Sequence, residues 1–124
     1  MKFDDSTPIY LQIKEEIENA IISSAIEEDQ PIPSIRMLAQ QYRLNPQTVS
    51  NAVSELLNEG YLYKKRGIGM FVKNGACKSL KKKRSDEFLV SELKKVFLKG
   101  KTLGIKKAQL IKIMEDVYEQ GGRL

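Results

Sequence analysis

The sequence predicts a mainly α-helical protein with one small β-hairpin, followed by a two-helix tail. Three observations lead to this fold class. Apolar residues recur at helical spacing in five separate stretches, and two short β-prone segments flank a glycine-containing turn within residues 61–73. A run of four cations at residues 81–84 separates the last two helical stretches from everything before them. Periodicity of this kind is the main sequence signal for helices and strands.

The first helix is predicted over residues 8–24. Apolar residues recur every three or four positions from Ile9 to Ile21, and glutamates occupy the opposite face. After this stretch come Pro31 and Pro33, which exclude a helix because proline and the residue before it disfavour helical backbone.

A second helix is predicted after Ser34, a favoured N-cap residue. Its apolar stripe has the spacing i, i+3, i+4, i+7 and consists of Ile35, Leu38, Ala39 and Tyr42.

The third helix is predicted to begin after Asn45, a favoured N-cap residue, with Pro46 at its first position and Gly60 placed to end it. Only Arg43 and Leu44 lie between Asn45 and the end of the second helix. The two helices must therefore turn sharply, as in a helix-turn-helix. The apolar stripe of the third helix consists of Val49, Ala52, Val53 and Leu56.

Short polar side chains remain on the outer side of this third helix: Gln47, Thr48, Ser50, Asn51 and Ser54. A surface helix kept only for stability usually carries long charged side chains, whereas base edges are read by donors and acceptors that approach closely. The helix is therefore a candidate reader of the DNA major groove. Taken by itself, the same face also fits an ordinary exposed helix.

A β-hairpin is predicted from segments 61–65 and 70–73, with Lys64, Lys65 and Arg66 at the edge of its turn. A hairpin that follows a helix-turn-helix is a wing. Arg66 could enter the minor groove or contact phosphate, and the two lysines would attract DNA irrespective of sequence. Gly67 and Gly69 fit turn geometry and close approach to DNA equally well.

Positions 8–73 resemble the N-terminal DNA-binding domain of the GntR family of bacterial transcription regulators. The resemblance lies in four ordered motifs, "PIYLQIKEEI", "PSIRMLAQQY", "NPQTVSNAVSELLNEGYL" and "RGIGMFV". It implies DNA contacts from Ser34, Arg36, Asn45, Gln47, Thr48, Ser50, Arg66 and Gly67. Two features depart from the family pattern: "SSAIEEDQ" replaces a glycine-containing turn, and Pro46 replaces an early arginine. The Asn-Pro pair is similar to the variant in the YtrA-like subgroup.

Three regions are expected: a winged helix-turn-helix domain over residues 1–77, a basic solvated linker over 78–84, and a two-helix tail over 85–124. The tail helices are predicted from Ser85 to about Leu98, with Gly100 as the stop, and over 105–119. Two such helices make too small a core to enclose a metabolite. Resemblance to the subgroup implies a homodimer, for which the expected residues are Phe88, Leu89, Leu93, Val96, Phe97, Leu110, Ile111, Met114, Val117 and Tyr118. The alternative is a tail folded back on its own winged domain.

Charge and composition narrow the function classes. Residues 1–32 carry two basic and eight acidic side chains, residues 33–77 six and two, and residues 78–124 thirteen and six. A basic middle and tail point toward a polyanion, although a merely solvated surface is equally compatible with charge alone. The absence of histidine and the single Cys77 exclude a tetrahedral zinc site and a Cys/His nucleophilic pair. No cofactor is expected, and no enzymatic activity.

A cytoplasmic location is expected, because residues 1–5 show no apolar signal segment and no stretch approaches the length of a membrane span. The combined expectation is a sequence-specific repressor that binds a palindromic DNA operator as a homodimer. Its recognition helix, 46–58, would lie in the major groove, where Gln47, Thr48, Ser50 and Asn51 would discriminate bases, and its wing, 61–73, would lie near the minor groove. The alternative is a protein-interaction module with a winged-helix fold. A small-molecule effector is compatible with the sequence, but no residue indicates one.

Overall fold

The computed structural model describes residues 5–120, and the chain folds as two compact units, Met1–Lys83 and Arg84–Leu124. Helices and one two-stranded antiparallel hairpin make up the structure, which confirms the predicted fold class. The prediction that the chain lacks a signal segment was based on residues 1–5. Residues 1–4 lie outside the described residues.

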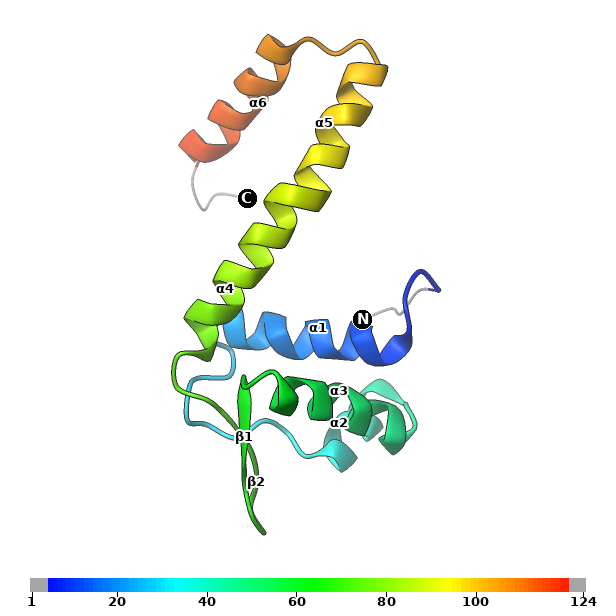
Figure 1. Ribbon diagram of the computed structural model, residues 1–124, viewed down its shortest axis with the longest axis vertical. Helices are drawn as coiled ribbons and strands as arrows, with labels where there is room; N and C mark the ends of the chain where they lie inside the picture. Colours follow the sequence, from blue (N-terminus) through cyan, green and yellow to red (C-terminus); the bar gives the residue numbers. More distant parts are fainter. Residues whose placement is uncertain (1–4, 121–124) are drawn as a thin grey trace. The chain divides into compact units, whose positions relative to one another are not determined.

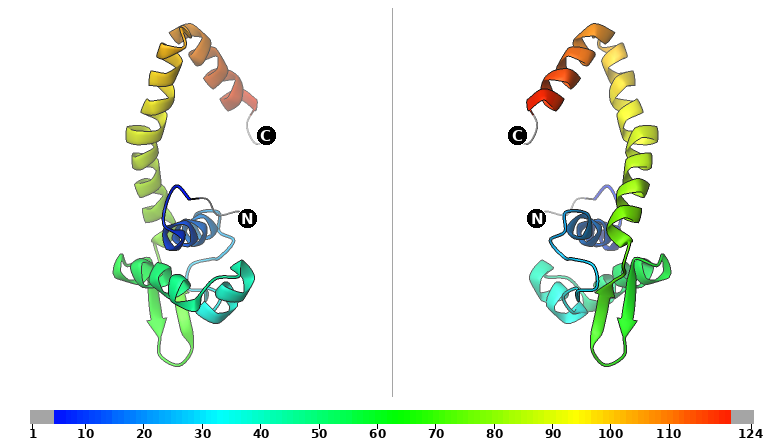
Figure 2. Two further views of the ribbon diagram at one scale, coloured as in Figure 1. Left: turned by 90° about the vertical axis from the view of Figure 1, so that its right-hand side faces the viewer. Right: turned by 90° about the vertical axis from the view of Figure 1, so that its left-hand side faces the viewer.

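The first unit contains three helices, a hairpin and most of a fourth helix. Helix α1 (Ile9–Ile22) packs on α3 (Pro46–Asn58), and α2 (Ile35–Tyr42) also packs on α3. Figures 1 and 2 show the hairpin, β1 (Leu62–Lys65) and β2 (Gly69–Val72), extending beyond these helices.

Side-chain caps fix the starts of α2 and α3. The Ser34 hydroxyl accepts a hydrogen bond from the Met37 amide at 3.1 Å, and Asn45 Oδ1 accepts one from the Gln47 amide at 2.7 Å. Between the helices, Arg43 has a φ of 55°, a left-handed conformation that turns the chain sharply. Both predicted N-caps and the helix-turn-helix are confirmed.

The core of the first unit combines side chains from every element of it. The predicted stripes of α2 and α3 supply most of their share, since Leu38 and Ala39 are buried and all four stripe residues of α3 are at most 1% exposed. The full cluster also includes Ile13, Ile17, Ile21, Ile32, Leu62, Val72, Ala76 and Leu80.

The hairpin pairs Leu62 with Val72 and Lys65 with Gly69, leaving three residues in its loop. The Ile68 amide donates to the Lys65 carbonyl at 2.9 Å, which closes a β-turn. Gly67 occupies the third position of that turn with a φ of 77°, as a type II turn requires. The predicted hairpin is confirmed, although β1 begins one residue later than predicted and β2 lies one residue earlier.

The basic segment 78–84, expected to be a solvated linker, instead lies within helix α4 (Ala76–Glu87). Ala76 and Leu80, four residues apart, are buried in the core of the first unit. Glu28 Oε2 accepts a hydrogen bond from the Cys77 amide at 3.1 Å and so caps the first turn of α4. The cations of this segment share a helix with buried apolar residues, which the run of charges concealed.

The second unit continues from α4 through a π-helical turn (Phe88–Glu92) into α5 (Leu93–Thr102), and α6 (Lys107–Gln120) follows. Ser85 lies inside α4, so it does not cap a helix. Gly100 lies inside α5, so it does not end one; Gly104, with a φ of 76°, follows the end instead. Gly100 is buried, and a β-carbon there would lie 3.5 Å from Leu110 Cδ1 of α6.

Candidate DNA-binding surface

The outer face of α3 is an uncharged, hydrogen-bonding stripe. Gln47, Asn51, Ser54 and Asn58 recur at i, i+4, i+7 and i+11, and all four are exposed, whereas the buried stripe faces the core. We call these four residues the outer stripe. Side chains of this kind can donate to and accept from base edges without a large cost of desolvating a charge.

Two members of the outer stripe are hydrogen-bonded to each other. Gln47 Nε2 donates to Asn51 Oδ1 at 2.9 Å. The Gln47 amide is bound by Asn45, so the side chain and the backbone of Gln47 are each held by an asparagine. The first turn of α3 is therefore ordered before any ligand binds.

The remaining predicted contact residues on the helices are placed less uniformly. Ser34 and Arg36 are exposed at the start of α2, where the Ser34 hydroxyl serves as the N-cap. Thr48 and Ser50 flank the outer stripe and are half-buried. Of the predicted readers on α3, Gln47 and Asn51 therefore have the most accessible side chains.

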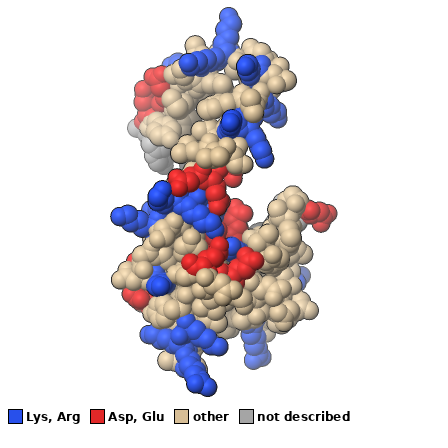
Figure 3. Space-filling view, in the orientation of Figure 1, with Lys and Arg blue, Asp and Glu red and all other residues tan. Residues whose placement is uncertain are grey.

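The predicted wing residues lie at the exposed end of the hairpin: Lys64, Lys65, Arg66 and Gly67. Lys65 Nζ is 4.3 Å from the centre of the Phe71 ring, a cation–π contact, and Phe71 stacks on Tyr63 at 5.7 Å. Lysine and arginine side chains gather at this end of the unit in Figure 3. The tip also carries Ile68, which is 73% exposed.

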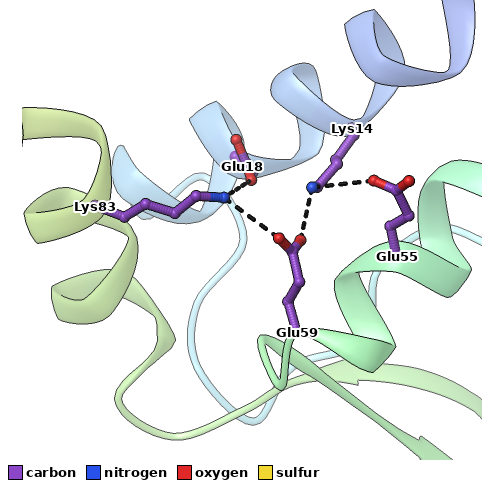
Figure 4. Close-up of polar contacts among 5 residues, drawn as sticks. All are labelled: Lys14, Glu18, Glu55, Glu59 and Lys83. Atoms are coloured by element: carbon purple, nitrogen blue, oxygen red, sulfur yellow. Dashed lines mark hydrogen bonds and ion pairs between the residues drawn. The ribbon is translucent and has the colours of Figure 1, made fainter. Parts of the chain in front are cut away.

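The acidic residues at the end of α3 are held by lysines from two other helices (Figure 4). Lys14 Nζ of α1 lies 2.7 Å from Glu59 Oε1 and 3.1 Å from Glu55 Oε2. Lys83 Nζ of α4 lies 3.4 Å from Glu59 Oε2 and 3.8 Å from Glu18 Oε2. We call these five residues the ion cluster. Its two lysines offset part of the negative charge of its three carboxylates.

The ion cluster shifts the pKa of two of its members in opposite directions. Burial disfavours the charged form of Glu59, but hydrogen bonds and charges from Lys14 and Lys83 outweigh it and lower the pKa of Glu59 below 4.5. Burial likewise disfavours the charged form of Lys14, but Glu59 and Glu55 outweigh it and raise the pKa of Lys14 above 10.5. Both groups are therefore more firmly charged than in an unfolded chain.

Sequence reasoning left some of these residues unassigned. Asn58 belongs to the outer stripe, and a helical projection of 46–58 would have shown it. The ion cluster joins residues up to 69 positions apart, from Lys14 to Lys83, so no local pattern could predict it.

The residues expected to mediate dimerisation are largely exposed within one chain. Among the described residues of the second unit, 84–120, Gly100 is the only one that is buried. Leu93 and Leu110 are half-buried, while the other eight expected residues are exposed. Further exposed apolar side chains, which were not predicted, are Val90, Leu98, Leu103, Ile105 and Ile113.

An N-capped helix-turn-helix followed by a cationic hairpin defines the winged-helix class of DNA-binding proteins. Residues 9–72 match the family model described as "Bacterial regulatory proteins, gntR family". The chain belongs to this family of DNA-binding transcription regulators, and both its fold and its relatives are those of regulators rather than enzymes.

Two curated relatives match different shares of this chain. HTH-type transcriptional repressor NagR of Bacillus subtilis is 43% identical over 65 residues, 52% of this chain, and the chain spans only 27% of its length. HTH-type transcriptional repressor YtrA of Bacillus subtilis is 28% identical over 112 residues, covering 90% of this chain and 85% of YtrA. This second match is consistent with the YtrA-like subgroup.

Two solved structures are similar at different scales. A GntR family transcriptional regulator from Listeria monocytogenes has a TM-score of 0.76 at 28% identity, covering 92% of this chain and 98% of its own. The AraR DNA-binding domain in complex with operator ORE1 has a TM-score of 0.53 at 36% identity, covering 58% and 88%. Within residues 5–120, none of the helices is both long and apolar enough to cross a membrane.

Proposed function

We propose that this protein is a sequence-specific transcriptional repressor that binds a palindromic operator as a homodimer in the cytoplasm. The observation that carries the proposal is the outer stripe of α3, an exposed row of uncharged donors and acceptors on a helix capped by Asn45. A helix of this kind can enter the major groove and discriminate base pairs, since each pair presents a distinct pattern there.

The wing supplies attraction that does not depend on sequence. Lys64, Lys65 and Arg66 are exposed at the hairpin, where they can contact phosphate or the adjacent minor groove. Ser34 and Arg36 at the start of α2 add polar and cationic groups from a third element. Phosphate contacts set the register on the duplex, and α3 reads bases.

Exposed apolar faces in the second unit support the homodimer. Phe88, Phe97 and Val117 are between 41% and 46% exposed, and two helices with so little burial are not stable alone. A second copy of the chain would cover such faces, and a twofold dimer would present two α3 helices to half-sites about 34 Å apart. NagR and YtrA are both described as transcriptional repressors, which supports repression as the sign of regulation.

The experiment is selection of bound duplexes from a random pool with the full chain. The expected result is an enriched consensus with twofold symmetry and half-sites separated by about one turn of DNA. Unchanged base composition after selection, with affinity no better than that of any basic protein of similar charge, would contradict the proposal and favour a protein-interaction module.

A further inference from the structure

The recognition helix lacks arginine and lysine, the side chains that most often read guanine. Helix α3 contains no lysine or arginine, and its one charged residue, Glu55, is ion-paired with Lys14 at 3.1 Å. Guanine presents two acceptors, N7 and O6, to the major groove and is read by side chains that offer two donors. The bidentate lysine or arginine contact to guanine must therefore come from another element, and α3 itself offers carboxamides and hydroxyls.

The hydrogen bond between Gln47 and Asn51 determines what the Gln47 carboxamide can offer. A carboxamide has one acceptor oxygen and two N–H donors, one on the side of the oxygen and one directed away from it. Asn51 Oδ1 accepts from Gln47 Nε2 at 2.9 Å and so occupies one donor. With the N–H that is directed away from the oxygen bound to Asn51, the Gln47 oxygen and the N–H beside it form an adjacent acceptor and donor.

An adjacent acceptor and donor complement adenine, whose N6 amino group donates and whose N7 accepts in the major groove. We propose that Gln47 reads an adenine in each half-site and that Asn51 is a positioning residue, which fixes the rotation of the Gln47 carboxamide. This inference rests on the proposed function and adds the base that α3 recognises. Asn45 contributes by holding the Gln47 backbone amide at 2.7 Å.

The test uses the full chain and the duplexes that it selects from a random pool. Each adenine of the consensus is replaced in turn by 7-deazaadenine, which has a carbon in place of N7 and leaves Watson–Crick pairing intact. At one adenine per half-site, we expect the replacement to weaken binding on the order of 5-fold or more, because it removes one of the two hydrogen bonds of a bidentate contact worth about 1–3 kcal/mol. Gln47→Ala should weaken binding to the unmodified duplex similarly and should make binding insensitive to the replacement.

Asn51 is tested by its effect on base preference rather than on affinity alone. Asn51→Ala should reduce the loss of affinity that 7-deazaadenine causes at the same position. The double variant Gln47→Ala/Asn51→Ala should be no less sensitive to the replacement than Gln47→Ala alone. Asn51→Asp keeps an acceptor oxygen and should restore the penalty, even if its charge weakens binding to all duplexes. Gln41→Ala, an exposed carboxamide on α2 that lies outside the outer stripe, is the matched control and should retain the penalty.

The outcomes separate this inference from the proposed function. A symmetric consensus whose adenines all tolerate 7-deazaadenine, or a penalty that survives in Gln47→Ala, would overturn the adenine assignment and leave the proposed function standing. A penalty that Asn51→Ala leaves unchanged would overturn the positioning role. A pool without any consensus would overturn both the inference and the proposed function.

Discussion

Lys14 and Glu59 are joined by an ion pair of 2.7 Å, which ties the middle of α1 to the residue that ends α3. The carboxylate also lies 3.4 Å from Lys83 of α4, so one side chain connects three helices of the first unit (Figure 4). The contribution of the Lys14–Glu59 ion pair to the free energy of unfolding depends on pH, because the pKa values of both side chains are shifted in the folded protein.

We expect the stabilising effect of Glu59 to be lost in acid. Its folded pKa lies below the ordinary value of 4.5, so its contribution is present above pH 4.5 and disappears as pH falls through the folded pKa. The thermal midpoint of Glu59→Gln should lie below that of the wild type at pH 7, by a few degrees at most, since partly exposed pairs contribute no more than about 1 kcal/mol. The gap between the two midpoints should narrow as the pH falls below 4.5; a gap as large in acid as at pH 7 would contradict this assignment.

The stabilising effect of Lys14 has the opposite dependence on pH. Its folded pKa is above 10.5, so its contribution is present below that pH and is lost as pH rises through the folded pKa. Lys14→Met should therefore be less stable than the wild type at pH 7, and the difference should shrink above pH 11. Urea unfolding at the two pH values measures it, with Lys106→Met as an exposed control.

Leu80 tests whether the start of α4 belongs to the first unit. The residue is fully buried, so Leu80→Ala should lower the free energy of unfolding by about 2–5 kcal/mol. Lys81→Ala, one position along the same helix and exposed, should change it by less than about 0.5 kcal/mol. Equal midpoints for the two variants in urea would show that α4 does not pack as described.

Gly67 tests the wing turn. Its φ of 77° strains any side chain, even though the space around it is open. Gly67→Ala should cost about 1 kcal/mol, and Gly67→Asn should cost less because asparagine tolerates left-handed backbone. Thermal unfolding compares them, and an alanine variant at least as stable as the asparagine variant would speak against the turn.

Arg66 tests the phosphate role of the wing. Arg66→Ala should weaken binding to selected and scrambled duplexes by the same factor and should reduce the slope of log affinity against log salt by about 1. Fluorescence anisotropy over a range of salt concentrations measures this. A loss confined to the selected duplex would instead assign Arg66 to base recognition.

Phe97 tests the homodimer. The wild type should sediment as a dimer, and Phe97→Asp should shift it toward monomer at the same concentration, because a buried charge opposes association of apolar faces. Lys95→Asp places the same side chain at an exposed position two residues earlier and is the matched control. A wild type that remains monomeric at high concentration would favour the tail folding back on its own winged unit.

Local signals made the helix-turn-helix predictable. Ser34, Asn45 and Pro46 have strong positional preferences, and the stripe from Val49 to Leu56 has helical spacing, so both helices begin and end where the sequence indicated. The hairpin was predictable for the same reason, since Gly67 supplies a conformation that few other residues adopt.

The prediction of a linker over 78–84 was wrong because one buried residue, Leu80, lies among the charged residues of this segment. Four cations in sequence resemble a solvated linker, yet Leu80 is buried in a core whose members reach back along the chain to Ile13. The prediction that Gly100 ends a helix was also wrong. A glycine can end a helix or lie within one, and here Gly100 lies buried near Leu110.

By itself, the sequence determined the class of the protein, the order of its elements and the face of α3 that is free to bind DNA, because caps, turns and helical periodicity act over a few residues. Only the tertiary structure decided that the basic segment 78–84 lies within helix α4, which packs into the core, and that Lys14 and Lys83 both contact Glu59. Those contacts join residues far apart in the chain, and their energies depend on burial and distance, which no local pattern encodes.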